Sequence, residues 1–416
     1  MATTTPITPR DPLAERRLGH RVPAPRRTRT AEAPPAGALR LAMVAPPWFE
    51  LPPQGYGGIE AVVAGLVDRL VDRGHHVTLI GAGRHRTRAQ RFAAVFPEPP
   101  SSLLGNPMPE VQAAAEAARV LDELDVDLVH DHSLAGPLLA RGRSLPTLTT
   151  MHGPVTGPNG DYYARLGRTI DIVAISDAQR RLNPDLNWVG TVHNAVDVAS
   201  FPFVERKDEY VLWLGRFSPD KGAHLAIDAA RAIGRHIVLA AKLNEPEERR
   251  YFEEAVAPRL GPDAEYVGEA DSELKRELFG RAAALAFPIQ WEEPFGMVMI
   301  EALACGTPVA AIGRGSVPEV IDSGRTGVVV DRIDEFPAAL ERATALDPVD
   351  CRREAETRFD LPVMAAGYER IYRMLAEGTR GLRELDTGPG AGRRHDGRGR
   401  ALAVDDGPEP RGTGLG

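Results

Sequence analysis

The stretch that decides the fold lies at residues 291–301 and reads Trp291-Glu292-Glu293-Pro294-Phe295-Gly296-Met297-Val298-Met299-Ile300-Glu301. An apolar segment, residues 283–289, precedes it and is typical of a buried parallel strand. Pro294 disfavours a helical conformation for Glu293, and Gly306 is typical of a helix end, so we expect a helix between these points. The sequence therefore predicts a strand, a turn that carries a carboxylate, and a helix with a free N-terminus.

A free helix N-terminus is suited to an anion. Its first N–H groups lack partners inside the helix and carry about half a positive charge, and Gly296 lets a ligand approach the backbone closely. At a rise of ~1.5 Å per residue, Glu301 lies about 8 Å along the helix, whereas Glu293 lies at the turn. The two carboxylates are therefore placed to bracket a polyhydroxylated anion.

This stretch resembles the E-x7-E motif of the retaining family-4 glycosyltransferases of the GT-B fold, with Glu293 and Glu301 as the two glutamates. The preceding strand, the Pro-Phe-Gly turn and the exit Gly306-Thr307-Pro308-Val309 match the family as well. The alternative is a capped helix whose glutamates face solvent. Further motifs between residues 40 and 330 favour the resemblance.

Length and composition set limits on the class of protein. The chain has 416 residues, of which 43% are hydrophobic, and this is enough to fill two cores. Cys305 and Cys351 have no spacing typical of a disulfide framework or a zinc cluster, which predicts a reducing, cytoplasmic location. No apolar stretch approaches the ~18 residues of a membrane span, so we expect no transmembrane segment and leave peripheral membrane contact open.

The formal charge of -8 is unevenly distributed. Residues 1–38 carry seven Arg against three acidic residues, and residues 380–416 carry seven Arg against six, which leaves -13 for residues 39–379. A core with this charge is not expected to bind nucleic acid. An anion can bind to this core only at a local cluster of cationic side chains and favourably oriented dipoles.

Strand-like and helix-like segments alternate over most of the chain, which predicts an α/β protein with two doubly wound, Rossmann-like domains. In such sheets ligands bind beyond the carboxyl ends of the strands, so two facing domains enclose a central cleft, as in the GT-B fold. The resemblance also implies a C-terminal helix that packs back on the first domain. The predicted divisions are a disordered extension (1–38), an N-terminal Rossmann-like acceptor-side domain (39–204), a C-terminal Rossmann-like nucleotide-sugar-binding domain (205–361), a crossover helix (362–380) and a disordered tail (381–416).

A basic turn follows the first strand expected in the second domain, residues 210–214, and reads Gly215-Arg216-Phe217-Ser218-Pro219-Asp220-Lys221-Gly222. It resembles the family's Gly-Arg to Lys-Gly segment, in which the two cations hold the donor diphosphate. Arg offers a bidentate fork and Lys a mobile point charge, and phosphate oxygens can use both. A solvated turn is the alternative reading.

Two segments of the first domain resemble other parts of the family's site. Gln54-Gly55-Tyr56-Gly57-Gly58-Ile59-Glu60 is similar to the donor loop, in which the N–H groups at Gly57 and Gly58 face the diphosphate. His152 follows a strand-like run and matches the histidine near the transferred sugar and the acceptor. Acceptor choice is expected to lie in residues 46–56 and 153–165, where Tyr56, Tyr162 and Tyr163 could stack on a ring.

No metal site is predicted. His130 and His132 would share a face if their strand ran on, but a third ligand is missing. Asp125-Val126-Asp127 matches a metal-binding pattern of another glycosyltransferase fold, yet a polar turn before a buried strand explains it better. We therefore expect neither a metal nor another cofactor, because Arg216, Lys221 and the helix N-terminus supply positive charge.

The resemblance implies a retaining glycosyltransferase that moves a hexose from a nucleoside-diphosphate sugar to a hydroxyl-bearing small molecule, glycan or lipid-linked acceptor. Glu301 would hold the ribose hydroxyls, and Glu293 with the 295–297 backbone would hold the sugar. The alternatives are a GT-B nucleotide-sugar epimerase, a phosphorylase, or an inactive nucleotide-sugar-binding protein. The expected catalytic residues are His152, Glu293, Arg216 and Lys221, and the expected donor-binding residues are Gly57, Gly58, Arg216, Lys221, Glu293, Phe295, Gly296, Met297 and Glu301.

Overall fold

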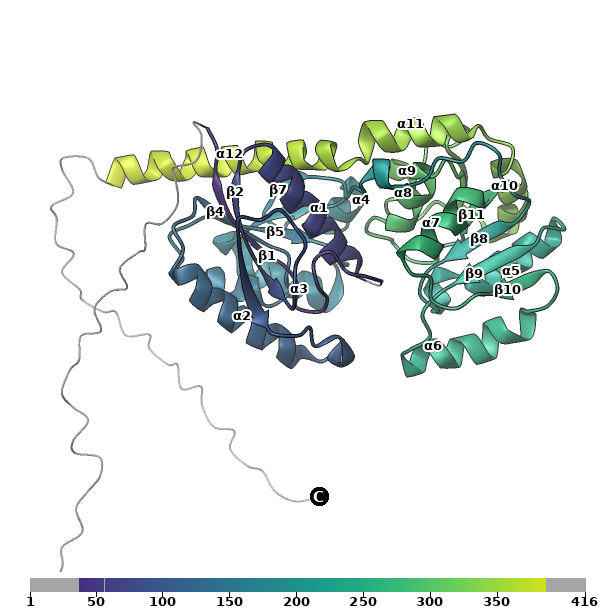
Figure 1. Cartoon of the computed structure of the whole chain (residues 1–416), viewed down its shortest axis with the longest axis horizontal. Helices are drawn as coiled ribbons and strands as arrows, with labels where there is room; N and C mark the ends of the chain where they lie inside the picture. The colour runs from purple at the N-terminus through teal and green to yellow at the C-terminus, as the bar shows by residue number, and fades with distance from the viewer. Residues whose placement is uncertain (1–36, 56, 387–416) are drawn as a thin grey trace, which may run out of the picture.

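The computed structural model describes residues 37–55 and 57–386, with side chains up to residue 378, and Figure 1 shows two α/β units joined by a long helix. Tyr56 lies outside the described residues, and so do residues 1–36 and 387–416, which hold most of the two segments predicted to be disordered. Within the described part of the chain, no helix is long and apolar enough to cross a membrane.

The first unit is built on a seven-stranded parallel sheet with the order β3-β2-β1-β4-β5-β6-β7. The order reverses between β1 and β4, so the loops that follow these two strands diverge and leave room for a ligand. The strands are β1 (Arg40–Val44), β2 (His76–Ala82), β3 (Arg91–Phe96), β4 (Leu128–Asp131), β5 (Thr147–Met151), β6 (Asp171–Ala174) and β7 (Trp188–Thr191). The helices are α1 (Gly58–Asp72), α2 (Pro107–Asp122), α3 (Gly157–Leu166) and α4 (Asp177–Leu182).

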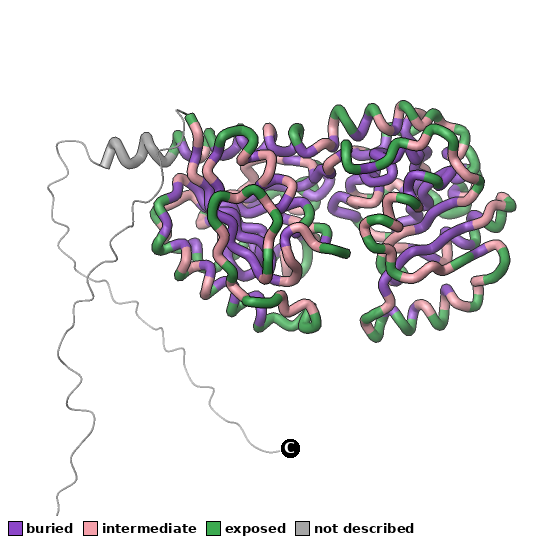
Figure 2. Tube along the Cα trace, in the orientation of Figure 1, coloured by how far each residue is buried: buried purple, intermediate pink, exposed green. Residues whose placement is uncertain are grey.

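The second unit repeats this plan with a six-stranded parallel sheet in the order β10-β9-β8-β11-β12-β13. Its strands are short, and the central ones are almost wholly buried, as the purple segments of Figure 2 show. The strands are β8 (Val211–Leu214), β9 (Ile237–Ala240), β10 (Ala264–Tyr266), β11 (Ala284–Phe287), β12 (Val309–Ile312) and β13 (Gly327–Val330). The helices are α5 (Ala223–Ala232), α6 (Pro246–Tyr251), α7 (Ser272–Arg281), α8 (Met297–Ala304), α9 (Val317–Val320), α10 (Phe336–Ala343) and α11 (Pro348–Arg358).

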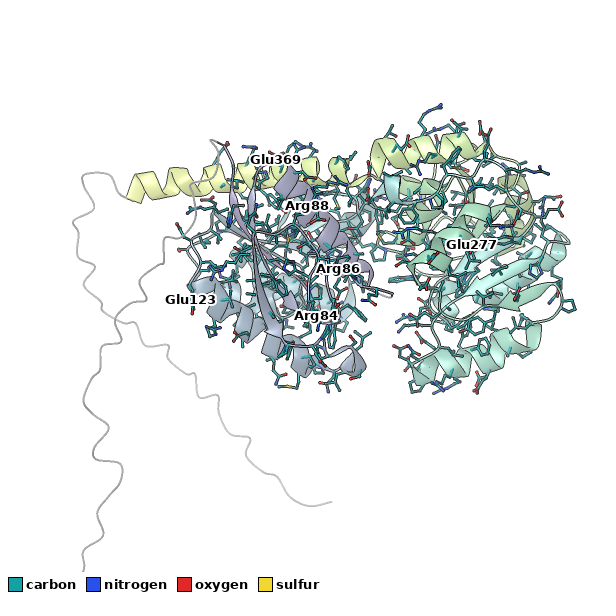
Figure 3. The ribbon with its side chains drawn as sticks, viewed as in Figure 1. Arg84, Arg86, Arg88, Glu123, Glu277 and Glu369 are labelled. Carbon is teal, nitrogen blue, oxygen red and sulfur yellow. The ribbon has the colours of Figure 1, made fainter. Side chains whose placement is uncertain are left out.

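Helix α12 (Leu361–Asp386) leaves the second unit and packs on the first (Figure 1). Tyr368 and Tyr372 are fully buried there, and Glu369, labelled in Figure 3, accepts a hydrogen bond from Arg73 at the end of α1. The helix extends six residues beyond the predicted boundary at residue 380. The low number of apolar residues in that segment predicted disorder. Adding residues to an existing helix, however, avoids the free-energy cost of nucleating a new one.

A second connection between the units comes from Glu319 on α9. Its carboxylate accepts the backbone N–H groups of Asp177 and Ala178 at 2.8 and 2.5 Å, at the start of α4 in the first unit. Arg358 donates to the Glu319 carbonyl at 2.7 Å. The units are therefore held together by a buried helix interface and by a carboxylate at a helix N-terminus.

The helix interface contains a buried polar network that can be tested. The Tyr372 hydroxyl lies 2.7 Å from Nδ1 of His130, and both residues are fully buried. Tyr372→Phe leaves that nitrogen without a partner and should lower the free energy of unfolding by about 1–3 kcal/mol in urea denaturation. Met374→Ala, on an exposed position of the same helix, should change it by no more than about 0.5 kcal/mol. Equal effects of the two substitutions would contradict this account.

Candidate active site

The turn between β11 and α8 has the predicted form. The chain leaves β11 at Phe287, and Gly296 adopts a left-handed conformation (φ 77°) at the N-cap of α8. Within the described part of the chain no side chain caps this helix, so its first N–H groups have no capping partner. Phe295 is buried in the core, so only its backbone can contact a ligand.

Glu293 lies inside an ion pair. Its Oε2 binds the ammonium of Lys221 and accepts a hydrogen bond from Trp291 Nε1 at 3.1 Å. The Lys221 ammonium also lies 5.0 Å from the centroid of the Trp291 ring, within range of a cation–π contact. Only 8% of Glu293 is exposed, which excludes the alternative of a solvent-facing carboxylate.

Glu301 is paired with a residue that sequence reasoning missed. Lys275 on α7 donates to Glu301 Oε1 at 2.6 Å, and Glu301 is also only 8% exposed. Lys275 lies 26 residues before Glu301, and no local spacing links the two. Each glutamate of the motif therefore has its own lysine.

A loop after β12 supports the turn from behind. Ser316 donates its N–H to the Glu293 carbonyl at 2.9 Å and its hydroxyl to the Phe295 carbonyl at 2.8 Å. Gly315 has φ 55°, and a Cβ there would lie 2.2 Å from the Glu293 carbonyl oxygen. Its N–H donates to Glu292 Oε2 at 2.8 Å, whereas Lys221 pairs with Glu293. This separates the roles of the two adjacent glutamates.

The basic turn after β8 divides into two parts. Arg216 is exposed and makes no ion pair with any residue that the structure describes. Lys221 ends a short 3-10 turn, and Gly222 follows in a left-handed conformation (φ 70°). A Cβ on Gly222 would lie 2.5 Å from the Pro288 carbonyl oxygen, so glycine allows this turn to pack against the exit of β11.

In the first unit, His152 follows β5 and lies beside a second histidine. Its Nε2 is 2.9 Å from Nδ1 of His132, and Gln179 holds the loop by donating to the Met151 and Gly153 carbonyls at 2.9 and 2.8 Å. Burial lowers the pKa of His152 to about 4, so the ring is neutral at pH 7.

The metal-like patterns have structural partners. Nδ1 and Nε2 of His130 lie within hydrogen-bonding distance of the Tyr372 and Thr150 hydroxyls, and its ring packs 4.0 Å from that of His132. Asp125 and Asp127 bind Arg40. Among residues 37–55 and 57–386, no three His, Cys, Asp or Glu side chains are grouped to hold a metal ion.

The predicted glycine loop stands at the start of α1. Gly57 adopts φ 137°, where a Cβ would lie 2.9 Å from that of Pro53, and Gly58 is exposed at the first helical position. The same loop reaches the second unit, because the Gln54 carbonyl accepts a hydrogen bond from Ser272 at 3.3 Å. Of the predicted stacking residues, Tyr163 is buried in the core and is unavailable to a ligand.

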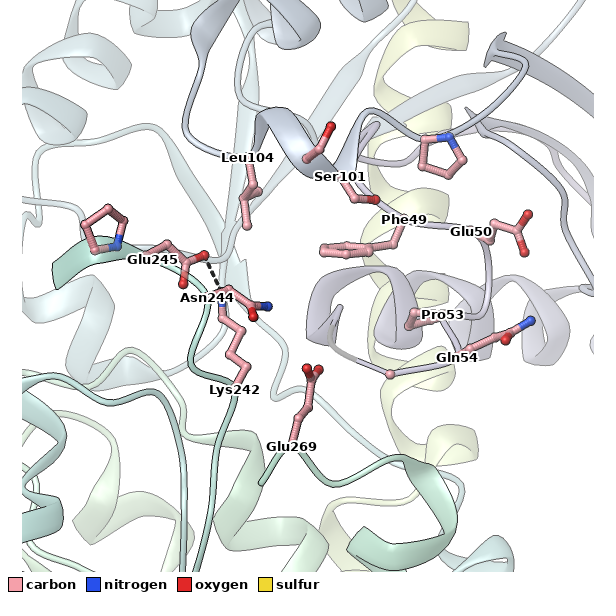
Figure 4. A pocket seen from close by; sticks show the side chains of 14 residues that line it. Phe49, Glu50, Pro53, Gln54, Ser101, Leu104, Lys242, Asn244, Glu245 and Glu269 are labelled. Atoms are coloured by element: carbon pink, nitrogen blue, oxygen red, sulfur yellow. Dashed lines mark hydrogen bonds and ion pairs between the residues drawn. The ribbon is translucent and has the colours of Figure 1, made fainter. Parts of the chain in front are cut away.

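Two cavities lie between the units. One, of about 230 Å³, brings the loop after His152 against the Glu293 turn; its lining is Pro154, Val155, Thr156, Gln179, Leu182, Trp291, Glu292, Glu293, Pro294 and Gly315. The other, of about 670 Å³, is shown in Figure 4. Phe49 and Leu104 face it from the first unit, and Lys242 and Glu269 face it from the second. The predicted residues Arg216 and Glu301 line neither cavity.

Two doubly wound parallel sheets with a helix crossing back to the first unit define the GT-B class of glycosyltransferases, which confirms the predicted fold. Family models match both units: "Glycosyltransferase Family 4" over residues 56–200 and "Glycosyl transferases group 1" over residues 199–355. The chain therefore belongs to the group 1 glycosyltransferases of family 4 and is a glycosyltransferase, as predicted.

Known relatives agree with this assignment. A solved glycosyltransferase involved in avilamycin A biosynthesis, AviGT4, shares 30% identity, covers 82% of this chain and 98% of its own, and has a TM-score of 0.65. The phosphatidyl-myo-inositol mannosyltransferase of Mycolicibacterium smegmatis is 26% identical over 372 residues, covering 80% of this chain and 93% of the relative. The Anabaena protein HepE, solved in complex with UDP and glucose, shares the fold at 16% identity, with a TM-score of 0.63 and coverage of 82% and 100%.

The support of the Glu293 turn by Gly315 can be tested with a matched glycine. Gly315→Ala adds both backbone strain and a clash with the Glu293 backbone, whereas Gly324→Ala, at φ 93° in open space, adds strain alone. Because small displacements of a catalytic group cost up to ~10²-fold in rate, Gly315→Ala should lower turnover roughly 10- to 100-fold. Gly324→Ala should keep turnover near wild type despite a lower melting temperature. Similar turnover of the two variants would show that this packing does not position Glu293.

Proposed function

We propose that the protein is a retaining hexosyltransferase that uses a nucleoside-diphosphate sugar and transfers the sugar to a hydroxyl group without a metal ion. One observation carries the proposal: Glu293, in the turn before α8, and Glu301, in the middle of α8, are each held by a lysine, and no described side chain caps the N-terminus of this helix. Hydroxyl groups and negative charge on one ligand match this arrangement.

The donor is assigned by the chemistry of these groups. Glu301 accepts hydrogen bonds from the ribose diol, and Glu293 with the backbone at the start of α8 binds the sugar hydroxyls. Arg216, Lys221 and the free N–H groups of α8 bind the diphosphate. A cation at 4 Å contributes ~4 kcal/mol at an effective dielectric of 20, so these groups can stabilise the charge that develops on the leaving diphosphate.

Transfer on one face of the sugar accounts for retention. The bond between the anomeric carbon and the diphosphate oxygen breaks, and the acceptor oxygen bonds to that carbon on the same face. The acceptor proton passes to an oxygen of the departing diphosphate, so no side chain has to act as nucleophile or base. We assign His152, which is neutral at pH 7, to this point, because Pro154, two residues further on, begins the part of the loop that lines the smaller cavity.

The larger cavity is the best candidate for the acceptor. At about 670 Å³ it is large enough for a drug-sized ligand. Phe49, Pro53 and Leu104 give it an apolar wall, while Asn244 and Glu269 offer hydrogen-bonding groups on the opposite side (Figure 4). This lining favours an amphipathic, hydroxylated acceptor.

Two buried free cysteines support a reducing, cytoplasmic setting.

No specific observation favours the alternative functions. An inactive nucleotide-sugar-binding protein does not require both lysine–glutamate pairs. None of the contacts described is specific to an epimerase or a phosphorylase. Product analysis with UDP-, GDP- and ADP-sugars tests the proposal. Transfer with retained anomeric configuration is expected, and an epimerised sugar or an inverted product would overturn it.

The two glutamates should have separable effects. Glu301→Ala removes a charged partner of the ribose and should weaken the free nucleoside diphosphate and the intact donor equally, by ~1.5–3 kcal/mol or roughly 10- to 150-fold. Glu293→Ala should change nucleotide affinity little while turnover collapses, because the lost contact belongs to the transferred sugar. Calorimetry with the nucleotide and turnover assays measure the two effects.

The control for both variants is Glu277→Ala, which removes an exposed carboxylate of α7 (labelled in Figure 3). This variant should bind and turn over like wild type. If Glu293→Ala and Glu301→Ala behave like this control, the assignment of the motif to donor binding fails.

Metal independence is the remaining prediction for the reaction. Lysine, arginine and a helix N-terminus already supply positive charge. After EDTA treatment and gel filtration, turnover should therefore stay within about twofold of the value for the untreated enzyme. Added Mg²⁺ or Mn²⁺ should not raise it further. Strict dependence on either ion would mean that a carboxylate pair interpreted as structural, such as Asp125 and Asp127, had been wrongly assigned.

A further inference from the structure

The hydrogen-bond chain behind His152 begins at a methionine. His132 is buried, its Nδ1 lies 2.9 Å from His152 Nε2, and its Nε2 lies 3.2 Å from the Met43 sulfur on β1. A thioether sulfur can only accept a hydrogen bond, so Nε2 of His132 must carry the proton that it donates to Met43.

The remaining protons follow from this first one. Burial and the two neighbouring histidines lower the pKa of His132 well below its ordinary value, so the ring is neutral and carries a single proton. Its Nδ1 is therefore bare and can only accept. The contact at 2.9 Å then requires that Nε2 of His152 donates, which leaves Nδ1 of the neutral His152 ring without a proton.

The bare nitrogen is accessible. Nδ1 of His152 makes no hydrogen bond with the described residues and is not among the buried polar atoms that lack a partner. His152 lies two residues before Pro154, where the loop begins to line the cavity shared with Glu293. A hydroxyl group in the cleft can donate to this nitrogen, whereas a group that can only accept cannot bind there.

We infer that Met43 and His132 are positioning residues that fix the tautomer of His152, so that it offers the cleft a hydrogen-bond acceptor. The inference deepens the proposed function and rests on it, because the group that His152 meets is then a hydroxyl of the donor sugar or of the acceptor. With this tautomer, the ring protons of His132 and His152 both point away from the cleft. Neither ring can therefore donate a hydrogen bond to a sugar hydroxyl there.

Nitrogen NMR of the full chain labelled with 15N-histidine tests the tautomer directly, because protonated and bare ring nitrogens have distinct shifts. His152 should show a proton on Nε2 and a bare Nδ1, assigned by the loss of its signals in His152→Ala. Met43→Leu removes the sulfur acceptor and should shift His152 toward the opposite tautomer. Met364→Leu, a buried methionine of the same core, is the control and should leave the signals unchanged. A proton on Nδ1 in the wild type, or equal spectra for the two leucine variants, would overturn the inference.

Activity provides the second arm. Asparagine can place an acceptor oxygen near the position of the His132 Nδ1, whereas leucine cannot. Losing one hydrogen bond should lower kcat about 3- to 10-fold in His132→Leu, and His132→Asn should recover most of that loss. Nucleotide affinity should be unchanged in both, because the nucleotide is assigned to the other unit. Equal impairment of the two variants would contradict a positioning role. If the wild type transfers no sugar, the proposed function fails while the NMR result still decides the tautomer.

Discussion

The contact of Glu319 with α4 holds together the two units between which the candidate site lies. Glu319 belongs to the second unit, and it accepts the first N–H groups of a first-unit helix, where the helix dipole favours a negative charge. Burial opposes its ionisation, but hydrogen bonds from His193 and from the two N–H groups outweigh this cost and lower the pKa of Glu319. A charged carboxylate therefore holds the interface at neutral pH.

This interface is continuous with the turn that carries Glu293. Ser316 immediately precedes α9 and donates to the carbonyls of Glu293 and Phe295, so one short loop carries both the interdomain contact and the support of the turn. Gly315 allows that loop to approach the Glu293 backbone more closely than any other residue could. The position of the Glu293 carboxylate is thus set partly by the same segment that fixes the opposite unit.

Local patterns in the sequence predicted much of this arrangement. Pro294 and Gly296 marked the start of α8, and the strands expected within residues 283–289 and 210–214 are β11 and β8. Contacts between residues far apart in the chain could not be predicted from these patterns. Lys275 meets Glu301, and Glu319 meets Asp177, only because the sheets order their strands as they do, and no spacing along the chain encodes either contact. Tyr163 shows the same limit, since its burial depends on distant residues.

The lysine–glutamate pairs resolve an electrostatic conflict in the proposed site. A bare carboxylate near a diphosphate would repel it by about as much as a cation attracts it, ~4 kcal/mol at 4 Å and an effective dielectric of 20. Lys221 removes this penalty by binding Glu293 directly, so the pair is neutral as a whole. The Lys221 ammonium has three N–H donors. One binds Glu293, and the other two can bind phosphate oxygens. Glu293 keeps acceptor capacity for sugar hydroxyls. One ion pair can therefore bind a neutral sugar and an anionic diphosphate side by side, which a carboxylate or an ammonium alone could not do.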